Sequence, residues 1–169
     1  MFTKVDISKL TLMDALDLAS LIEVEAHQRY LYFAAQVGHR DPGDAASVFR
    51  SMAANEKKHG EQLAERRLAL FGDAPARVTL DDIFDVEAPD FGSPRWNMSP
   101  LKALELALAS EKKAFAFYDE ALPGVKQPDV KALFEELRDE EVEHIHMVEA
   151  IIAKLPPAAA IDLEDVDAD

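Results

Sequence analysis

The 169-residue chain contains no cysteine. Disulfide bonds, cysteine-ligated zinc, iron–sulfur clusters and thiol catalysis are therefore excluded, because each of them needs a thiol or thiolate. Basic residues are also scarce: 18 Lys and Arg stand against 33 Asp and Glu, which gives a formal net charge of −15. We expect no binding to nucleic acid, whose phosphates require a basic surface. Carboxylates do attract cations.

Long apolar runs are absent as well. No stretch of about 18 uncharged apolar residues occurs, so we expect no membrane-spanning helix and no membrane partner. The first residues carry no basic segment that leads into an apolar run, so we expect no secretory signal and predict a cytoplasmic protein. Hydrophobic residues nevertheless make up 49% of the chain, which is typical of one folded domain with a sizeable core.

Apolar residues recur every three or four positions in four long segments, which predicts four amphipathic helices. Their expected ranges are 12–38, 44–71, 99–122 and 128–155. Thr11 and Ser99 are suited to cap the first and third helices, and Pro100 suits a first helical turn. No segment alternates with a period of two, so we expect an all-α fold without a sheet.

The connections between these segments predict how the helices are arranged. Short loops join the first helix to the second and the third to the fourth, and short loops make antiparallel neighbours. Residues 72–98 form a much longer connection, rich in Pro and Asp, for which we expect an irregular crossover. The result is a four-helix bundle of two antiparallel hairpins in residues 1–157, followed by an acidic, mobile tail in residues 158–169.

The two hairpins resemble each other in sequence. Each carries a Glu-x-x-His pair in its second helix and, in its first helix, a glutamate followed seven residues later by a tyrosine. The Glu-x-x-His pairs are Glu56 with His59 and Glu141 with His144. The Glu–Tyr pairs are Glu25 with Tyr32 and Glu111 with Tyr118. They are separated along the chain by almost the same number of residues as the two Glu-x-x-His pairs. The repeat predicts a pseudo-two-fold axis between the hairpins.

These acids and histidines interrupt the apolar stripes, which places six side chains inside the bundle at a similar height. They are Glu25, Glu56, His59, Glu111, Glu141 and His144. An unpaired carboxylate in a core is costly or stays protonated, and four together repel one another. Two divalent ions would balance the four charges, and the spacing of Glu-x-x-His places both side chains on one helical face. The sequence therefore predicts a dinuclear metal site.

Several neighbouring residues have alternative interpretations. A single Glu-x-x-His pair would be typical of a solvated helix face, and only the full set favours metal. Glu143 and His146 form a competing pair, but the stripe and the repeat both favour His144. We expect Tyr32 and Tyr118 to donate hydrogen bonds to ligand carboxylates; packing as ordinary core aromatics is the alternative.

With these motifs the chain resembles the rubrerythrin and bacterioferritin branch of the ferritin-like superfamily, over roughly residues 12–155. The resemblance implies a ferritin-like bundle that holds two iron ions per chain, or manganese. It implies one ion on Glu25 and His59, the other on Glu111 and His144, and bridging by Glu56 and Glu141. Bacterioferritins often bind haem through a Met directly after the glutamate of the second helix; Lys57 stands there, so we expect no haem.

We therefore predict a non-haem di-iron oxidoreductase that reacts Fe(II) with peroxide or O₂, as a peroxidase or ferroxidase in oxidative-stress or iron handling. The alternatives are a subunit of an iron-storage cage and a helical interaction module with structural metals. Rubrerythrins usually carry a four-cysteine rubredoxin domain, so this chain would need an external electron donor. We expect a homo-oligomer and favour a dimer, because the crossover and tail leave little room in a cage.

Overall fold

The computed structural model describes residues 4–37, 43–83, 86–89 and 94–162. Over these ranges it contains four long helices and no strand, so the predicted all-α class is confirmed. The long helices are α1 (Leu12–Gln36), α2 (Ala45–Phe71), α3 (Pro100–Ala121) and α4 (Pro128–Ala153). Short 3₁₀ turns are η1 (Ile7–Lys9), η2 (Leu80–Asp82), η3 (Leu122–Gly124) and η4 (Pro157–Ala160). No helix in the described part of the chain is long and apolar enough to cross a membrane.

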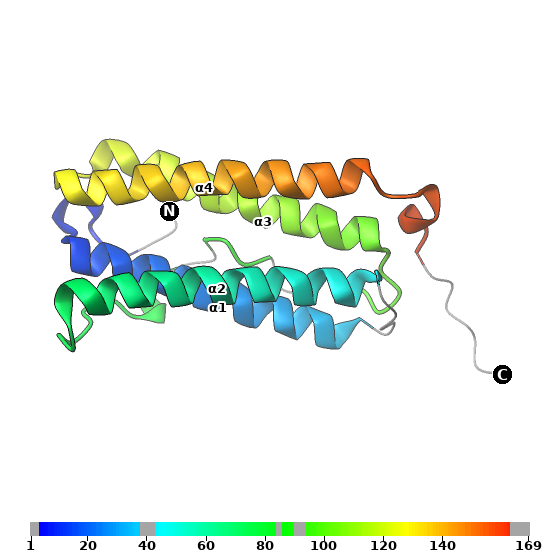
Figure 1. Ribbon diagram of the computed structural model, residues 1–169, viewed down its shortest axis with the longest axis horizontal. Coiled ribbons are helices and arrows are strands. Elements are labelled where there is room, and N and C mark those ends of the chain that lie inside the picture. The colour runs from blue at the N-terminus through cyan, green and yellow to red at the C-terminus, as the bar shows by residue number, and fades with distance from the viewer. Residues whose placement is uncertain (1–3, 38–42, 84–85, 90–93, 163–169) are drawn as a thin grey trace.

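The helices form two hairpins, as predicted. Helix α1 packs along α2, and α3 packs along α4. Figure 1 shows that α2 ends at one end of the bundle and that α3 begins at the opposite end. Residues 72–98 therefore cross the length of the bundle to join the hairpins, which is the ferritin-like arrangement.

The helix ends follow from local sequence. Thr11 and Asp14 form a capping box at the start of α1: the Thr11 hydroxyl accepts from the Asp14 N–H at 3.3 Å, and the Asp14 carboxylate accepts from the Thr11 N–H at 3.2 Å. Ser99 caps α3 with Pro100 in the first turn. Helix α2 ends at Gly72, whose φ of +57° favours glycine. Both expected N-caps are confirmed. Helix α1 ends at Gln36, before the expected end at residue 38, which lies outside the described residues.

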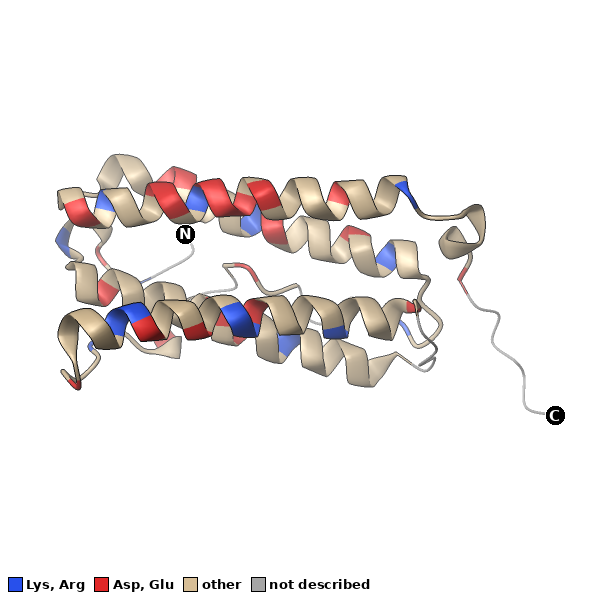
Figure 2. Ribbon diagram, viewed as in Figure 1, with Lys and Arg blue, Asp and Glu red and all other residues tan. Residues whose placement is uncertain are grey.

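The hydrophobic core is divided into two clusters, one toward each end of the bundle. Members of the first cluster include Leu16, Ile22, Leu63, Phe117, Tyr118 and Phe134. Members of the second include Tyr30, Phe33, Phe49, Met52, Leu104 and Val148. In all four helices the residues between these two groups include buried acids, and Figure 2 shows acidic positions near the middle of the bundle. A polar layer thus separates two apolar ones.

The C-terminal segment differs from expectation. A mobile tail is predicted from residue 158, but residues 157–160 form η4. Asp162 Oδ1 then accepts a hydrogen bond from the Ser99 N–H at 3.1 Å, which attaches the segment to the start of α3. This bond satisfies one of the N–H groups that a helix start leaves without a partner. The remainder of the predicted tail, residues 163–169, lies outside the described residues.

Candidate metal centre

One glutamate from each long helix lies in the polar layer. These are Glu23 of α1, Glu56 of α2, Glu111 of α3 and Glu141 of α4, and none is more than 4% exposed. Each continues the buried face of its own helix; Glu56, for example, lies one turn after buried Met52. The fold therefore brings four carboxylates to one level of the core, where water is excluded.

Two of these glutamates and His59 form a first triad between α1 and α2. One ligand atom each from Glu23, Glu56 and His59 lie within 4.8 Å of one another. His59 Nδ1 is 4.0 Å from Glu23 Oε2 and 3.9 Å from Glu56 Oε2. Gly60 allows α1 and α2 to approach closely here, because a Cβ at this position would lie 3.3 Å from Glu23 Cβ.

The second triad lies between α3 and α4 and has the same composition. Ligand atoms of Glu111, Glu141 and His144 also lie within 4.8 Å of one another. His144 Nδ1 is 3.2 Å from Glu111 Oε2 and 3.4 Å from Glu141 Oε2. The His59 and His144 rings stack with centroids 4.6 Å apart and planes 3° apart. The two triads are therefore neighbours, as the repeat predicts.

Burial strongly disfavours negative charge on this layer. It raises the pKa of Glu23 well above the usual range, and the nearby charge of Glu56 raises it further. The pKa of Glu56 is raised by burial and by the charge of Glu111. Burial raises the pKa of Glu141 to about 8, although the nearby His144 opposes the shift. Without a cation, these carboxylates resist ionisation.

The two histidines differ in their environments. Burial, followed by the nearby charge of His144, lowers the pKa of His59 to about 4. Burial also opposes protonation of His144, but its hydrogen bond to Glu111 and the nearby carboxylate of Glu141 outweigh it and raise the pKa of His144 to about 10. The charged imidazole of His144 thus partly neutralises its own triad, whereas the triad of His59 contains no cation.

The unsatisfied atoms in this layer fit metal ligation. Within the described part of the chain, five buried ligand atoms of the two triads have no hydrogen-bond partner. They are Glu23 Oε2, Glu56 Oε2, His59 Nδ1, Glu111 Oε1 and Glu141 Oε2. Buried polar atoms in folded proteins nearly always have a partner, and metal ions would supply one to all five. Carboxylate and imidazole donors suit iron and manganese.

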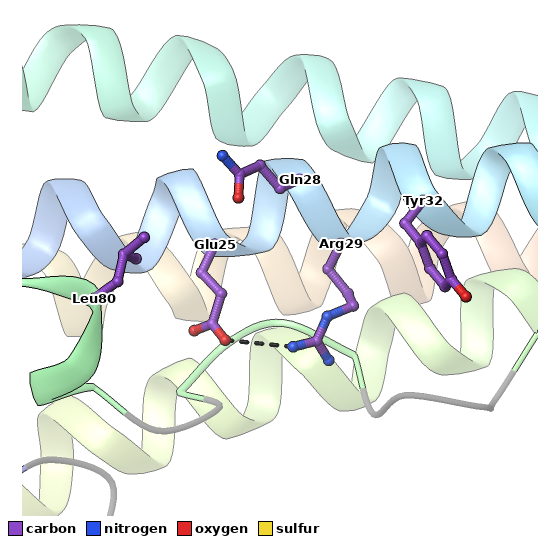
Figure 3. Close-up of a pocket in the computed structure, with 5 residues that line it drawn as sticks. All are labelled: Glu25, Gln28, Arg29, Tyr32 and Leu80. Carbon is purple, nitrogen blue, oxygen red and sulfur yellow. Dashed lines mark hydrogen bonds and ion pairs between the residues drawn. The ribbon is translucent and has the colours of Figure 1, made fainter.

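Five of the six predicted ligands lie in this layer, but Glu25 does not. Figure 3 shows Glu25 on another face of α1, where it points to Arg29; the two side chains form an ion pair at 3.4 Å. Gln28 and Tyr32 line the same outer cavity, which has a volume of about 380 Å³. Glu23 occupies the place predicted for Glu25, and this is a correction to the expected ligand set.

Glu23, and not Glu25, continues the buried face of α1. Small alanines carry much of that face: Ala15, Ala19 and Ala26 are all fully buried or nearly so. Leu16 and Tyr30, each seven positions from Glu23, lie on the same buried face, whereas Glu25 lies about 200° from Glu23 around the helix. A signal for Glu23 was present, because Tyr30 follows it by seven residues, as Tyr118 follows Glu111. Glu25 is separated from Glu111 by almost the same number of residues as Glu56 is from Glu141, which favours Glu25 in the repeat. The two hairpins differ in length, however, because residues 37–44 connect the first and residues 122–127 connect the second.

The two predicted tyrosines have different outcomes. Tyr32 is 50% exposed, lies outside the polar layer, and is not placed to orient a ligand. Tyr118 is buried, and its pKa is raised well above the usual range by burial and by the charge of Glu23. Tyr30 is the counterpart of Tyr118 in α1 and is buried in the opposite hydrophobic cluster. One buried tyrosine therefore borders the polar layer on each side.

A fifth buried carboxylate comes from the crossover and was not predicted. Glu87 is 1% exposed, and both of its carboxylate oxygens lack a hydrogen-bond partner in the described part of the chain. One ligand atom each from Glu87, Glu23 and Glu141 lie within 4.8 Å of one another. A second such group is formed by Glu87 with Glu56 and Glu111. No periodic pattern marks a single buried residue in an irregular segment, so sequence reasoning had no signal for it.

The competing pair, Glu143 and His146, lies outside the layer as predicted, because both residues are exposed, whereas His144 faces the layer.

Two surface cavities lie beside the triads. One of about 170 Å³ between α2 and α4 is lined by residues that include His59 and Glu140. Another of about 240 Å³ between α1 and α2 is lined by residues that include Glu23 and Glu56. Both cavities are thus lined in part by side chains of the first triad.

Comparison with known proteins agrees with this geometry. The family model of the ferritin-like domain matches residues 13–158. The chain therefore belongs to the ferritin-like domain family, as the motifs predict. Among curated proteins, no sequence matches the chain.

Solved structures from several organisms share the fold. A crystal structure of an uncharacterised conserved protein from Magnetospirillum magnetotacticum MS-1 is 30% identical, with a TM-score of 0.64, over 87% of this chain and 97% of that one. A hypothetical protein from Pyrococcus furiosus is 19% identical, with a TM-score of 0.53, over 85% and 89%. Bacterioferritin from Rhodobacter capsulatus, described with a metal-free dinuclear site and haem iron, is 22% identical, with a TM-score of 0.52, over 93% and 96%.

Proposed function

We propose that this protein is a non-haem di-iron oxidoreductase that reacts with peroxide or O₂. The observation that carries the proposal is the pair of adjacent, buried Glu₂His triads at the level where the hydrophobic core is interrupted. In the proposed assignment, Glu23, Glu56 and His59 hold one ion, and Glu111, Glu141 and His144 hold the other. When bound, iron would supply the one-electron redox chemistry that these side chains lack.

Charge balance favours divalent ions over a metal-free core. Four carboxylates in a region of low dielectric repel one another, and burial has already raised the pKa values of Glu23, Glu56 and Glu141. A metal ligand must be deprotonated, and the imidazole must be neutral. His59, whose pKa is about 4, is in the neutral form at neutral pH. Loading the second triad would require His144 to release a proton.

The surroundings of the site favour a small oxidant. The cavities that reach His59 and Glu23 have volumes of about 170 and 240 Å³, which accommodates molecules of the size of peroxide or O₂. The apolar clusters on both sides of the layer keep bulk water away, which protects a reactive centre from side reactions. The chain contains no cysteine, so we propose an external electron donor.

Rapid-mixing kinetics test this function. Protein loaded with Fe(II) under anaerobic conditions is mixed with hydrogen peroxide or with O₂, and the near-ultraviolet absorption is followed. The proposal predicts rapid oxidation by at least one of the two, and repeated turnover when a reductant is added. A Glu25→Gln variant should behave as wild type because Glu25 lies outside the layer. Iron that binds but stays inert toward both oxidants would contradict the proposal and favour structural metals.

A further inference from the structure

The buried carboxylate of Glu87 has no structural explanation in the fold alone. It belongs to the central crossover segment, residues 86–89, all of which are buried. Both oxygens of Glu87 lack a hydrogen-bond partner in the described part of the chain. A carboxylate whose two oxygens are both buried and unsatisfied is rare, because desolvation is costly without a partner. The position of Glu87 therefore indicates that its carboxylate binds a cation.

The central crossover segment is held in place from both hairpins. Lys113 of α3 donates a hydrogen bond from Nζ to the Ala88 carbonyl at 2.7 Å. Arg29 of α1 donates from its guanidinium to the Pro89 carbonyl. These two contacts fix the backbone immediately after Glu87 and direct its side chain toward the polar layer. Locking by such supporting hydrogen bonds is what a ligand side chain on an irregular segment needs.

Glu87 lies among all four helix glutamates. It shares one group of closely spaced ligand atoms with Glu23 and Glu141, and a second with Glu56 and Glu111. Each of these groups combines one glutamate from each hairpin, so Glu87 faces both triads. Burial raises the pKa of Glu87 well above the usual range, and repulsion by the nearby charge of Glu23 raises it further.

We propose that Glu87 is a seventh metal ligand, supplied by the crossover and facing both ions of the dinuclear site. The inference rests on the proposed metal function and extends it in one respect. A ligand on the crossover connects metal loading to the conformation of a segment that is otherwise held by Lys113, Arg29 and packing. Metal binding would then fasten the central crossover segment to the bundle, and loss of metal would loosen it.

Hydrogen–deuterium exchange on the wild-type chain gives the first test. Exchange of the amides of residues 86–88 is measured in chelator-treated protein and after loading with Mn(II), with binding measured separately by calorimetry. The inference predicts that Mn(II) slows exchange in this segment. Two bound ions without any added protection of the segment would contradict the Glu87 assignment and leave the proposed metal function intact. Absence of bound ions would overturn both.

Substitution gives the second test. The Glu87→Gln variant keeps the shape of the side chain and removes its charge; Asp81→Asn is the matched control, since Asp81 is an exposed acid on the same crossover. We expect Glu87→Gln to bind Mn(II) about tenfold or more weakly and to lose the protection caused by the metal. The control should keep both. Wild-type affinity together with wild-type protection in Glu87→Gln would overturn the assignment.

Discussion

At the scale of single residues, the site depends on which acids of α1 point inward. Glu23 and Glu25 are two positions apart, which is about 200° around a helix, so only one of them can face the core. The structure buries Glu23 to 4% exposure, while Glu25 pairs with Arg29. The two glutamates provide a matched pair of variants, because each change removes one charge from the same helix.

Metal affinity should depend on Glu23 and not on Glu25. We expect Glu23→Gln to weaken binding of Mn(II) at one of two sites by about 10–100-fold, since it removes one of three ligands from the first triad. Glu25→Gln should leave stoichiometry and affinity unchanged. Isothermal titration calorimetry of both variants measures this. Equal losses in the two variants would show that charge alone, and not ligation, determines the affinity.

The same substitution should have the opposite effect on the stability of metal-free protein. The pKa of Glu23 is raised in the folded state by burial and by Glu56, so ionising it favours unfolding. A group of this kind contributes stability at low pH that is lost as the pH rises through its folded pKa. The metal-free wild type should therefore lose stability between about pH 5, just above the ordinary glutamate pKa, and alkaline pH.

Glu23→Gln should lose less stability over that range, because an amide does not ionise. At pH 9 we expect it to exceed the wild type by about 1 kcal/mol, or about 2–4 °C in Tm for a chain of this size. Thermal unfolding in the presence of a chelator, followed by circular dichroism, measures the difference. Parallel pH profiles for the two proteins would mean that the pKa of Glu23 is the same in the folded and unfolded protein.

At the scale of elements, the start of α1 is fixed by an acid that needs its negative charge. The pKa of Asp14 is lowered: burial opposes this, but hydrogen bonds from Arg77 and Thr11 outweigh it. A lowered pKa contributes stability above the ordinary aspartate pKa, and that contribution is lost as the pH falls through the folded value. We expect Asp14→Asn to cost about 1 kcal/mol at pH 7.

This cost should shrink below about pH 4, the ordinary aspartate pKa, because the wild-type carboxylate is then protonated as well. Urea unfolding at pH 7 and pH 3.5 compares the two proteins. Asp81→Asn, on the exposed side of η2, is the control and should be neutral at both pH values. A cost for Asp14→Asn that does not change with pH would mean that packing, and not charge, is responsible.

The elements also show how far the sequence alone could lead. The four helices, the N-caps of α1 and α3 and the crossover were predicted because periodicity, Thr11, Ser99 and the loop lengths are local signals. The Glu-x-x-His pairs were predicted because their spacing fixes them on one helical face. Glu23 was missed because both Glu23 and Glu25 precede a tyrosine by seven residues, and the spacing of the internal repeat favours Glu25. Glu87 was missed because burial in an irregular segment depends on tertiary contacts such as the Lys113–Ala88 hydrogen bond.

At the scale of the whole molecule, the number of chains in the assembly distinguishes a small redox enzyme from a storage cage. The fold is shared with a bacterioferritin, but a likeness of 22% identity concerns the fold and not the assembly. We favour a small oligomer, a dimer above all, and not a storage cage. Light scattering coupled to size-exclusion chromatography should give a mass of a few chains of 18.7 kDa. A particle of many chains that takes up many irons per chain would contradict this and favour storage.

The central claim is that the polar layer of the core holds two metal ions. Metal analysis of protein loaded anaerobically with Fe(II) and freed of excess metal tests it most directly, with His59→Ala and His144→Ala as companions, since each removes one imidazole from one triad. The account predicts two irons per wild-type chain and a reduced content in each variant. Fewer than one iron per wild-type chain, or equal contents in all three proteins, would contradict it.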